Sequence, residues 1–355
     1  MRQSGHDLRV MLAHLTGRGL EKNEPMKSTM ADVAAAAGVS PMTVSNCYKH
    51  PHKVHAETRE KVLATAAALG YVPNLIASSL ASGHNRTITA VVPSLSNSSF
   101  ARTLEGLGDF LESQRYELLL AVAEDPQRET QVIRGILGRR PAGIVLTGGE
   151  HTQETIRLIQ QSGVPVVETW LSSAPSIDMA VGFSLSDAAY DMTRLVIDKG
   201  LRHIGWAGHN LPDSQRYLQR QQGFQKAMEE AGLRSDLIHL SAESEGFAGG
   251  RLAIEALLKK ERRLQALCCV TDVVAAGALF ECARRGWKVP ARFAVAGYGD
   301  YQIAAEVPPG LTSVKTNGAG IGRAAGELLV QKIETGQVDD RVRRVPYEII
   351  VRGSV

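Results

Sequence analysis

Residues 38–50, GVSPMTVSNCYKH, carry side chains that are well suited to binding a nucleic acid. Hydroxyl, amide and basic groups lie close together in this segment: Ser40, Thr43, Ser45, Asn46 and Lys49. Hydroxyl groups, basic groups and the amides of a helix start bind phosphates, whereas an amide side chain pairs with the edge of a base. The alternative is that the segment is one piece of a helical bundle with no further role.

The segment belongs to a region with the pattern of three short helices. Thr29 followed by Asp32 is typical of a capping box at the start of a helix. Gly38 ends that helix, and Ser40 before Pro41 starts the next one. Two short helices joined by such a tight turn form a helix-turn-helix, whose second helix enters the major groove of DNA.

Helical spacing predicts which sides of these helices are buried. Val39 and Val44 are expected to face the helical core. A third helix begins near residue 56, and its apolar face is predicted to comprise Val62, Leu63, Ala66 and Leu69. The outward face of the second helix is predicted to comprise Pro41, Met42, Ser45, Asn46 and Lys49. A helix made only for packing would not need this small, amide and basic face, so the pattern favours DNA binding.

From residue 87 the sequence alternates between short apolar runs and amphipathic helices. Eleven runs, among them ITAVVPS and AGIVLTG, predict strands buried on both faces, as in a parallel doubly wound sheet. Eleven strands exceed the usual size of one open sheet, about 4–6 strands, so two lobes that face a cleft are predicted. The predicted fold class is an all-α helix-turn-helix headpiece followed by a two-lobed α/β domain like that of periplasmic binding proteins.

The predicted boundaries divide the chain into four parts. These are a flexible tail (1–26), the headpiece (27–72), a hinge or linker with latent helicity (73–86) and an effector-binding and dimerisation domain (87–355). The two lobes of the last part are predicted to comprise about 87–169 with 317–343, and about 170–316 with 344–355.

Composition excludes several classes of protein. The chain has 355 residues, of which 44% are hydrophobic, and its apolar runs are shorter than the roughly 20 residues of a membrane span. No signal-peptide pattern is present at the N-terminus, so a cytoplasmic protein that does not enter the membrane is expected. Residues 27–86 carry six Lys or Arg against three Asp or Glu, an excess equal to the +3 of the whole chain. This local excess suits a nucleic-acid partner but does not establish one.

Chemical motifs are sparse. The four cysteines lack CxxC spacing and are expected to be reduced. No nucleophile elbow, metal-ligand spacing or phosphate loop is present, so we predict no catalytic residue, metal or cofactor. The run GAGIGRAAG at 318–326 is interpreted as small residues for close helix packing.

A family resemblance agrees with this interpretation. The stretch MADVAAAAGVSPMTVSNCYKHPHKVHAETREKVLATAAALGYVPNLIASSLASG resembles the DNA-binding headpiece of the lactose/galactose-repressor (LacI-type) family. The resemblance covers roughly residues 28–353. The pieces VVPSLSNSSFARTLEGL, VPVVE and IDMAVGF are most similar to the gluconate-repressor branch.

The resemblance implies roles in DNA binding. Phosphate contacts are expected from Ser40, Thr43 and Ser45, and contacts with base edges from Pro41, Met42 and Asn46; Thr29 and Lys49 complete this predicted surface. Asn46 stands where many members have Arg, and Asn pairs with adenine rather than guanine. A hinge helix is implied at Asn74, Ala77, Ser78 and Leu80, with Leu80 as the minor-groove wedge. Leu75 stands where a basic residue is frequent.

The resemblance also implies an effector site between the lobes. Its candidate residues are Ser94, Asn97, Phe100, Thr147, Glu150, Glu168, Arg220, Thr271 and Asp300. Asp272, beside Thr271, is a further candidate. Ser94 and Asn97 are alternatively loop formers, Phe100 is alternatively a core residue, and Asp272 is alternatively a helix cap. The guanidinium of Arg220 suits a carboxylate, and acidic side chains accept hydrogen bonds from hydroxyl groups.

These features favour gluconate or a keto-gluconate over a neutral sugar. Family members often have GYDD where this chain has GYGD, so Gly299 supplies no carboxylate, which indicates an open-chain ligand or a degenerate pocket. The hypothesis is a homodimeric repressor of a pseudo-palindromic operator in double-stranded DNA, with no membrane partner. The alternative is a solute-binding or sensor protein for a neutral sugar with the same fold.

Overall fold

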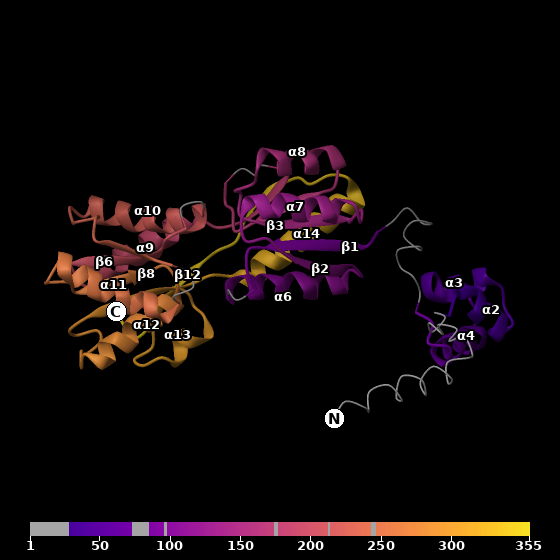
Figure 1. Cartoon of the computed structure of the whole chain (residues 1–355), viewed down its shortest axis with the longest axis horizontal. Coiled ribbons are helices and arrows are strands. Elements are labelled where there is room, and N and C mark those ends of the chain that lie inside the picture. The colour runs from indigo at the N-terminus through magenta and orange to yellow at the C-terminus, as the bar shows by residue number, and fades with distance from the viewer. Residues whose placement is uncertain (1–27, 73–84, 96–97, 174–176, 212–213, 243–245) are drawn as a thin grey trace, which may run out of the picture. The chain divides into compact units, whose positions relative to one another are not determined.

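The computed structural model describes residues 28–72, 85–95, 98–173, 177–211, 214–242 and 246–355. These residues form two compact units, a small helical one and a larger α/β one, which we describe separately (Figure 1). The predicted tail and most of the predicted linker lie outside the described residues.

The helical unit contains the predicted three helices with a short 3₁₀ turn. Their bounds are α2 (Met30–Ala37), α3 (Pro41–Lys49), η1 (Pro51–Lys53) and α4 (Ala56–Ala68). The Thr29 side chain accepts from the Asp32 amide and the Asp32 carboxylate accepts from the Thr29 amide, which confirms the capping box. Gly38 ends α2 with φ +68°, a conformation that glycine adopts without strain.

The core of the helical unit is small and consists of short side chains. It comprises Val33, Ala34, Ala37, Val44, Cys47, Val62 and Ala66. Val39 packs against this core and Val44 lies in it, as predicted. The predicted apolar face of α4 is only half right. Leu63 and Leu69 are each 39% exposed, because the buried stripe follows the four-residue step from Val62 to Ala66.

The first lobe of the α/β unit is built on a parallel sheet with strand order β11-β5-β4-β3-β1-β2. Its strands are β1 (Thr87–Val92), β2 (Glu117–Val122), β3 (Gly143–Thr147), β4 (Val166–Thr169), β5 (Met179–Gly182) and β11 (Val342–Arg344). Two pairs of neighbouring helices accompany the sheet, α6 (Ser98–Ser113) with α14 (Gly318–Thr335), and α7 (Pro126–Leu137) with α8 (Gln153–Ser162).

The second lobe has the strand order β12-β10-β9-β8-β6-β7. Its strands are β6 (Ile204–His209), β7 (Ile238–Ser241), β8 (Ala266–Cys269), β9 (Ala294–Gly299), β10 (Thr312–Lys315) and β12 (Glu348–Ile350), and only β12 is antiparallel to its neighbour among the described strands. Its helices are α9 (Leu185–Asp198), α10 (Gln215–Glu230), α11 (Phe247–Lys260), α12 (Asp272–Arg284) and α13 (Gln302–Glu306).

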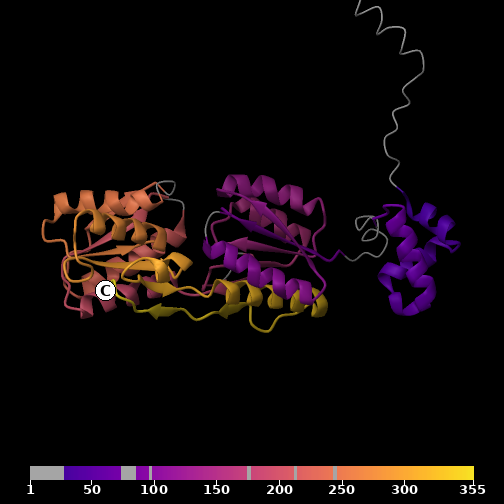
Figure 2. The same ribbon diagram turned by 90° about the horizontal axis from the view of Figure 1, so that it is seen from below.

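The chain passes between the lobes at three places within the described residues: after β5, after β10 and after β11. Figure 2 shows the last of these, in yellow, running from one lobe into the other. The two later crossings lie close to the predicted boundaries at residues 317 and 344. The predicted boundary between residues 169 and 170 was wrong. The run at Met179–Gly182 adds to the first sheet beside β4, so the first lobe extends beyond residue 170.

Close helix packing explains the glycine-rich run at the start of α14. A Cβ atom on Gly322 would collide with the main-chain oxygen of Thr103 on α6, and one on Gly106 would collide with the main chain of Ala319. The predicted packing role of this run is therefore confirmed. No helix among the described residues is long and apolar enough to cross a membrane.

Candidate functional site

Helix α3 presents the outward face that its sequence predicts. Met42 is 69% exposed, and Pro41 and Lys49 are also exposed. Ser45 and Asn46 are partly exposed, on the side of the helix away from the buried Val44 and Cys47. This surface offers a hydroxyl, an amide and an ammonium group to a partner.

The hydroxyl groups at the helix starts are engaged within the unit. The Ser40 hydroxyl accepts from the Thr43 amide at 3.1 Å and lies 2.9 Å from the Thr43 hydroxyl. The Thr29 hydroxyl donates to the Asp32 carboxylate at 2.7 Å. These bonds stabilise the starts of α3 and α2. The predicted phosphate contacts of Ser40 and Thr43, and the predicted place of Thr29 in the DNA-binding surface, remain predictions.

The helical unit also contains the cysteine beside Asn46, and the predicted hinge follows it in the chain. Cys47 is a core residue, and burial raises the pKa of its thiol, so its place beside Asn46 needs no chemical explanation. The predicted hinge residues Asn74, Leu75, Ala77, Ser78 and Leu80 lie outside the described residues.

A cleft of about 720 Å³ lies between the two lobes of the α/β unit. Its lining from the first lobe follows the carboxyl ends of β1, β2 and β3, and its lining from the second lobe follows β6 and continues into α10. Ligands of doubly wound sheets bind at these strand ends, and the volume suits a small molecule. Four of the predicted residues line it: Ser94, Phe100, Thr147 and Glu150.

The first-lobe side of the cleft is acidic. Its described carboxylates are Glu124, Asp125, Glu129 and Glu150. Asp125 is fixed as the N-cap of α7, where its side chain accepts from the Arg128 amide at 2.7 Å. Such carboxylates are strong acceptors for hydroxyl groups.

Glu129 is held by a buried network beneath this wall. The His151 Nδ1 atom lies 2.7 Å from a Glu129 oxygen, and its Nε2 atom lies 3.4 Å from an oxygen of Glu168. Burial alone would lower the pKa of His151, but the hydrogen bond to Glu129 and the charges of both carboxylates outweigh it and raise the pKa to about 9. His151 is therefore an imidazolium at neutral pH, held between two glutamates.

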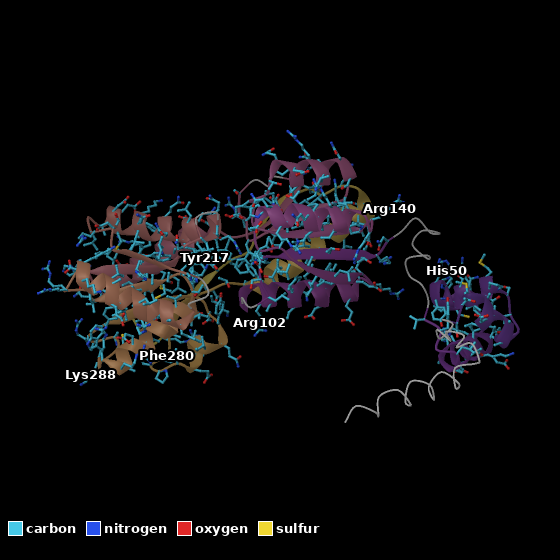
Figure 3. The ribbon with its side chains drawn as sticks, viewed as in Figure 1. His50, Arg102, Arg140, Tyr217, Phe280 and Lys288 are labelled. Atoms are coloured by element: carbon cyan, nitrogen blue, oxygen red, sulfur yellow. The ribbon has the colours of Figure 1, made fainter. Side chains whose placement is uncertain are left out.

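The second lobe contributes a cation to the cleft. Arg216 on α10 lines it, and its guanidinium carbon lies 4.9 Å from the centre of the Phe100 ring on α6 of the other lobe. Tyr217, which Figure 3 labels, lines the cleft beside it. Among the described lining residues, Arg216 is the only lysine, arginine or histidine. The cleft thus has an acidic side and a side with one guanidinium.

Four other predicted effector residues are not among the described lining residues: Glu168, Arg220, Thr271 and Asp300. Asn97 lies outside the described residues. Glu168 is fully buried, where it accepts from the Ile177 amide at 3.0 Å and meets His151. Thr271 caps α12 through the Val274 amide. Asp300 pairs with Arg352 at 2.7 Å. Their contacts with an effector remain predictions.

Arg220 lies one turn beyond Arg216 on α10 and is 6% exposed. One guanidinium nitrogen donates to the Val270 carbonyl at 2.9 Å, and the guanidinium carbon lies 4.0 Å from the centre of the Tyr298 ring. Its Nε atom has no hydrogen-bond partner, and it forms no ion pair with a carboxylate among the residues described. A buried cation without an acidic partner is suited to an anionic ligand.

Sequence reasoning missed several lining residues. They are Pro93, Leu95, Val122, Ala123, Glu124, Asp125, Pro126, Glu129, Leu211, Ser214, Arg216 and Tyr217. Most lie at or just after a strand end, so the rule that ligands lie beyond the carboxyl ends of strands would have found VAEDP at the end of β2 and the segment after β6.

Comparison with known proteins assigns the chain to a family. Residues 29–74 match the family described as bacterial regulatory proteins, lacI family, and residues 193–355 match a periplasmic binding protein-like domain. The transcriptional regulator GntR of Escherichia coli K12 is 32% identical over 337 residues, which cover 95% of this chain and 100% of that protein. The chain belongs to the LacI family of transcription regulators.

Other LacI-family proteins agree with this assignment. The regulator GntR of Pseudomonas aeruginosa is 34% identical, with 92% of this chain and 96% of that protein covered. A crystal structure of a LacI-family regulator from Silicibacter pomeroyi superposes with a TM-score of 0.84 at 30% identity, and covers 92% of this chain and 99% of that one. The headpiece and the two-lobed fold are thus those of a DNA-binding regulator. The family consists of transcription regulators and not of enzymes.

Proposed function

We propose that this chain is a homodimeric transcription repressor whose operator affinity is controlled by an open-chain sugar acid, of the gluconate or keto-gluconate type. The observation that carries the effector class is the two-sided cleft, with carboxylates on the first lobe and a guanidinium on the second. Carboxylates accept hydrogen bonds from the hydroxyl groups of a polyol, and a guanidinium binds a carboxylate in a planar, bidentate way.

Arg220 supports an anionic ligand independently of Arg216. It has one carbonyl acceptor, a Tyr298 ring beside it and no carboxylate partner among the described residues. Because Arg220 does not line the cleft, its charge favours an anion on this side of the cleft without a direct contact. Glu168 and Asp300 already have partners in the chain, so they act on the ligand only if those partners are exchanged.

In the proposed complex with DNA, helix α3 reads the major groove. Ser40, Thr43 and Ser45 bind phosphates, and Met42 and Asn46 face base edges. An asparagine pairs with adenine N6 and N7, so the operator differs from that of relatives with arginine at this position. Two headpieces of a dimer recognise two half-sites, which makes the operator pseudo-palindromic.

Exposed apolar side chains on both lobes support the proposed dimer. Leu119 and Leu120 on the edge strand β2 are 42% and 50% exposed. On the second lobe, the rings of Phe247 on α11 and Phe280 on α12 are 5.8 Å apart, and the two residues are 47% and 41% exposed. Figure 3 labels Phe280. A second copy that covers these groups removes apolar surface from water and protects the edge of the first sheet.

Control of DNA binding follows from a change in the angle between the lobes. Effector in the cleft contacts both lobes and favours the closed arrangement, which shifts the dimer, separates the hinges and lowers operator affinity. A ligand shifts this equilibrium only by its differential affinity for the two states, so we expect a coupling of about 1–3 kcal/mol.

The test is a gel shift of the purified full-length chain with the region upstream of its own gene, at physiological salt, with and without gluconate. We expect binding much tighter than to random DNA and its weakening by gluconate. Equal affinity for the upstream region and for random DNA in all conditions overturns the proposal of a repressor. If only neutral sugars change the affinity, the proposal of a sugar-acid effector is overturned in favour of a neutral-sugar effector.

A further inference from the structure

The charges that line the cleft are unequal in number and divided between the lobes. Four carboxylates belong to the first lobe, whereas one guanidinium, that of Arg216, belongs to the second, among the lining residues that the structure describes. One ligand anion has a counter-charge at that guanidinium. A second anion on the same ligand has none at the opposite wall, where it meets like charges.

The acidic wall is fixed and does not withdraw from a second anion. Asp125 is bonded to the Arg128 amide at the start of α7, and Glu129 is bonded to the buried His151. The charge of His151 does not neutralise the wall, because Glu168 shares the same imidazolium. Glu124 and Glu150 add two further carboxylates at the ends of β2 and β3.

Arg216 is placed to receive the one anion. Its guanidinium lies 4.9 Å from the Phe100 ring of the opposite lobe and 5.9 Å from the Tyr217 ring, so it stands where the two lobes face each other. Arg220, four residues later on α10, is buried behind Tyr217 and does not line the cleft. A carboxylate that enters the cleft therefore meets Arg216 first.

We infer that the cleft selects for a polyol with a single anionic end, bound in one orientation: the anion at Arg216 and the hydroxyl groups along the acidic wall. Sugar diacids and phosphorylated sugar acids, which carry negative charge at both ends, are rejected. The inference rests on the proposed sugar-acid effector and adds to it the ligand's orientation, the selectivity and Arg216 as the residue that determines it.

The test uses three ligands with the same six-carbon chain and different charge. Glucitol is neutral, gluconate carries one carboxylate and glucarate carries two. Their affinities for the full-length protein are measured by titration calorimetry at neutral pH. We expect gluconate to bind more tightly than glucitol by about 10- to 100-fold, the range for a hydrogen bond to a charged group, and glucarate to bind at least about tenfold more weakly than gluconate.

Two variants separate the two sides of the cleft, and a third is the control. Arg216→Gln lowers gluconate affinity to near that of glucitol and leaves glucitol affinity within about threefold, because only the anion contact is lost. Glu150→Gln raises the affinity for glucarate relative to gluconate by about tenfold. Glu105→Gln removes an exposed carboxylate outside the cleft and leaves all three affinities unchanged.

The outcomes are distinct. Glucarate that binds as tightly as gluconate overturns the selectivity, and Arg216→Gln with an unchanged preference for gluconate over glucitol overturns the orientation. In both cases the sugar-acid effector stands, because gluconate still binds. If the wild-type protein binds none of the three ligands, the proposed effector class itself is overturned, and this inference is overturned with it.

Discussion

The buried network of Glu129, His151 and Glu168 makes a prediction about stability and pH. The His151 side chain is 1% exposed and lies between two carboxylates, one in the cleft wall and one fully buried. His151→Gln replaces the cation with a neutral amide of similar size. Glu168 then keeps its hydrogen bond from the Ile177 amide but loses its counter-charge.

The size of the effect follows from these contacts. Removing one partner of a buried ion pair costs about 3–5 kcal/mol, and the retained Ile177 bond places this case near the lower end. The same value follows from the proton affinity: a pKa raised from 6.5 to about 9 corresponds to roughly 3 kcal/mol at about 1.4 kcal/mol per pH unit. Because the pKa is raised in the folded state, this stabilisation is complete below pH 6.5 and is lost as the pH rises through about 9.

Urea unfolding of the wild-type protein and the variant at pH 6 and pH 9.5 measures both effects. We expect a difference of ~3 kcal/mol at pH 6 that mostly disappears at pH 9.5. His203→Gln is the matched control, because the His203 pair with Glu261 is 3.4 Å long and partly open to solvent, and such pairs contribute about 0–1 kcal/mol. If His151→Gln and His203→Gln cost the same at both pH values, the network does not contain a buried imidazolium.

Two further substitutions test the packing of the first lobe and the DNA contact. Gly322→Ala drives a methyl group into the Thr103 carbonyl and is expected to destabilise the protein by about 1–3 kcal/mol in thermal unfolding. Gly135→Ala is the control: its Cβ position on α7 is surrounded by open space, so the substitution is expected to stabilise the protein by roughly 0.5 kcal/mol. Equal effects of the two would contradict the close approach of α6 and α14. Asn46→Ala is expected to remove about 1–3 kcal/mol of preference for adenine at one operator position without changing thermal stability, and sites selected from random DNA report it. A uniform loss on every sequence would instead indicate a phosphate contact.

Local signals were sufficient to predict the helical unit. The Thr29 and Asp32 side chains, Gly38 and Ser40 each act within a few residues of their own position, so their effects do not depend on the rest of the fold. The face of α4 was harder to predict. Leu63 and Leu69 are as apolar as core residues, but the short side chains of α2 and α3 leave room only for the stripe of Val62 and Ala66.

In the α/β unit, the apolar runs predicted eleven of the twelve strands in the described residues. The missed strand, β11, has three residues, two of them arginine, and lies at the sheet edge, so it has no buried run to detect. The wrong lobe boundary has a related cause. A run such as Met179–Gly182 is apolar in either lobe, and only its pairing with β4 decides to which sheet it belongs.

The site residues were predictable where a side chain at a strand end is open to the cleft. They were not predictable where another side chain of the protein binds the predicted residue. Ser94 follows β1, Thr147 is the last residue of β3 and Glu150 follows it; all three line the cleft. Glu168 lies near the end of β4 and Asp300 follows β9, but His151 pairs with Glu168 and Arg352 pairs with Asp300 within the chain. Both partners are distant in sequence or come from loops, so composition and spacing do not reveal them.

The two arginines of α10 show the same limit most clearly. Arg216 and Arg220 are four residues apart and lie on one side of the helix, so their spacing does not distinguish them, and the family resemblance pointed to Arg220 alone. The sheet beneath makes them different, because the Val270 carbonyl and the Tyr298 ring, which extend from β8 and β9, cover the turn that carries Arg220. Arg216, on the preceding turn of α10, instead contacts Phe100 of the other lobe. A residue that contacts both lobes is the one whose occupancy by an anion depends on the lobe angle, and this is why Arg216 rather than Arg220 determines the proposed selectivity.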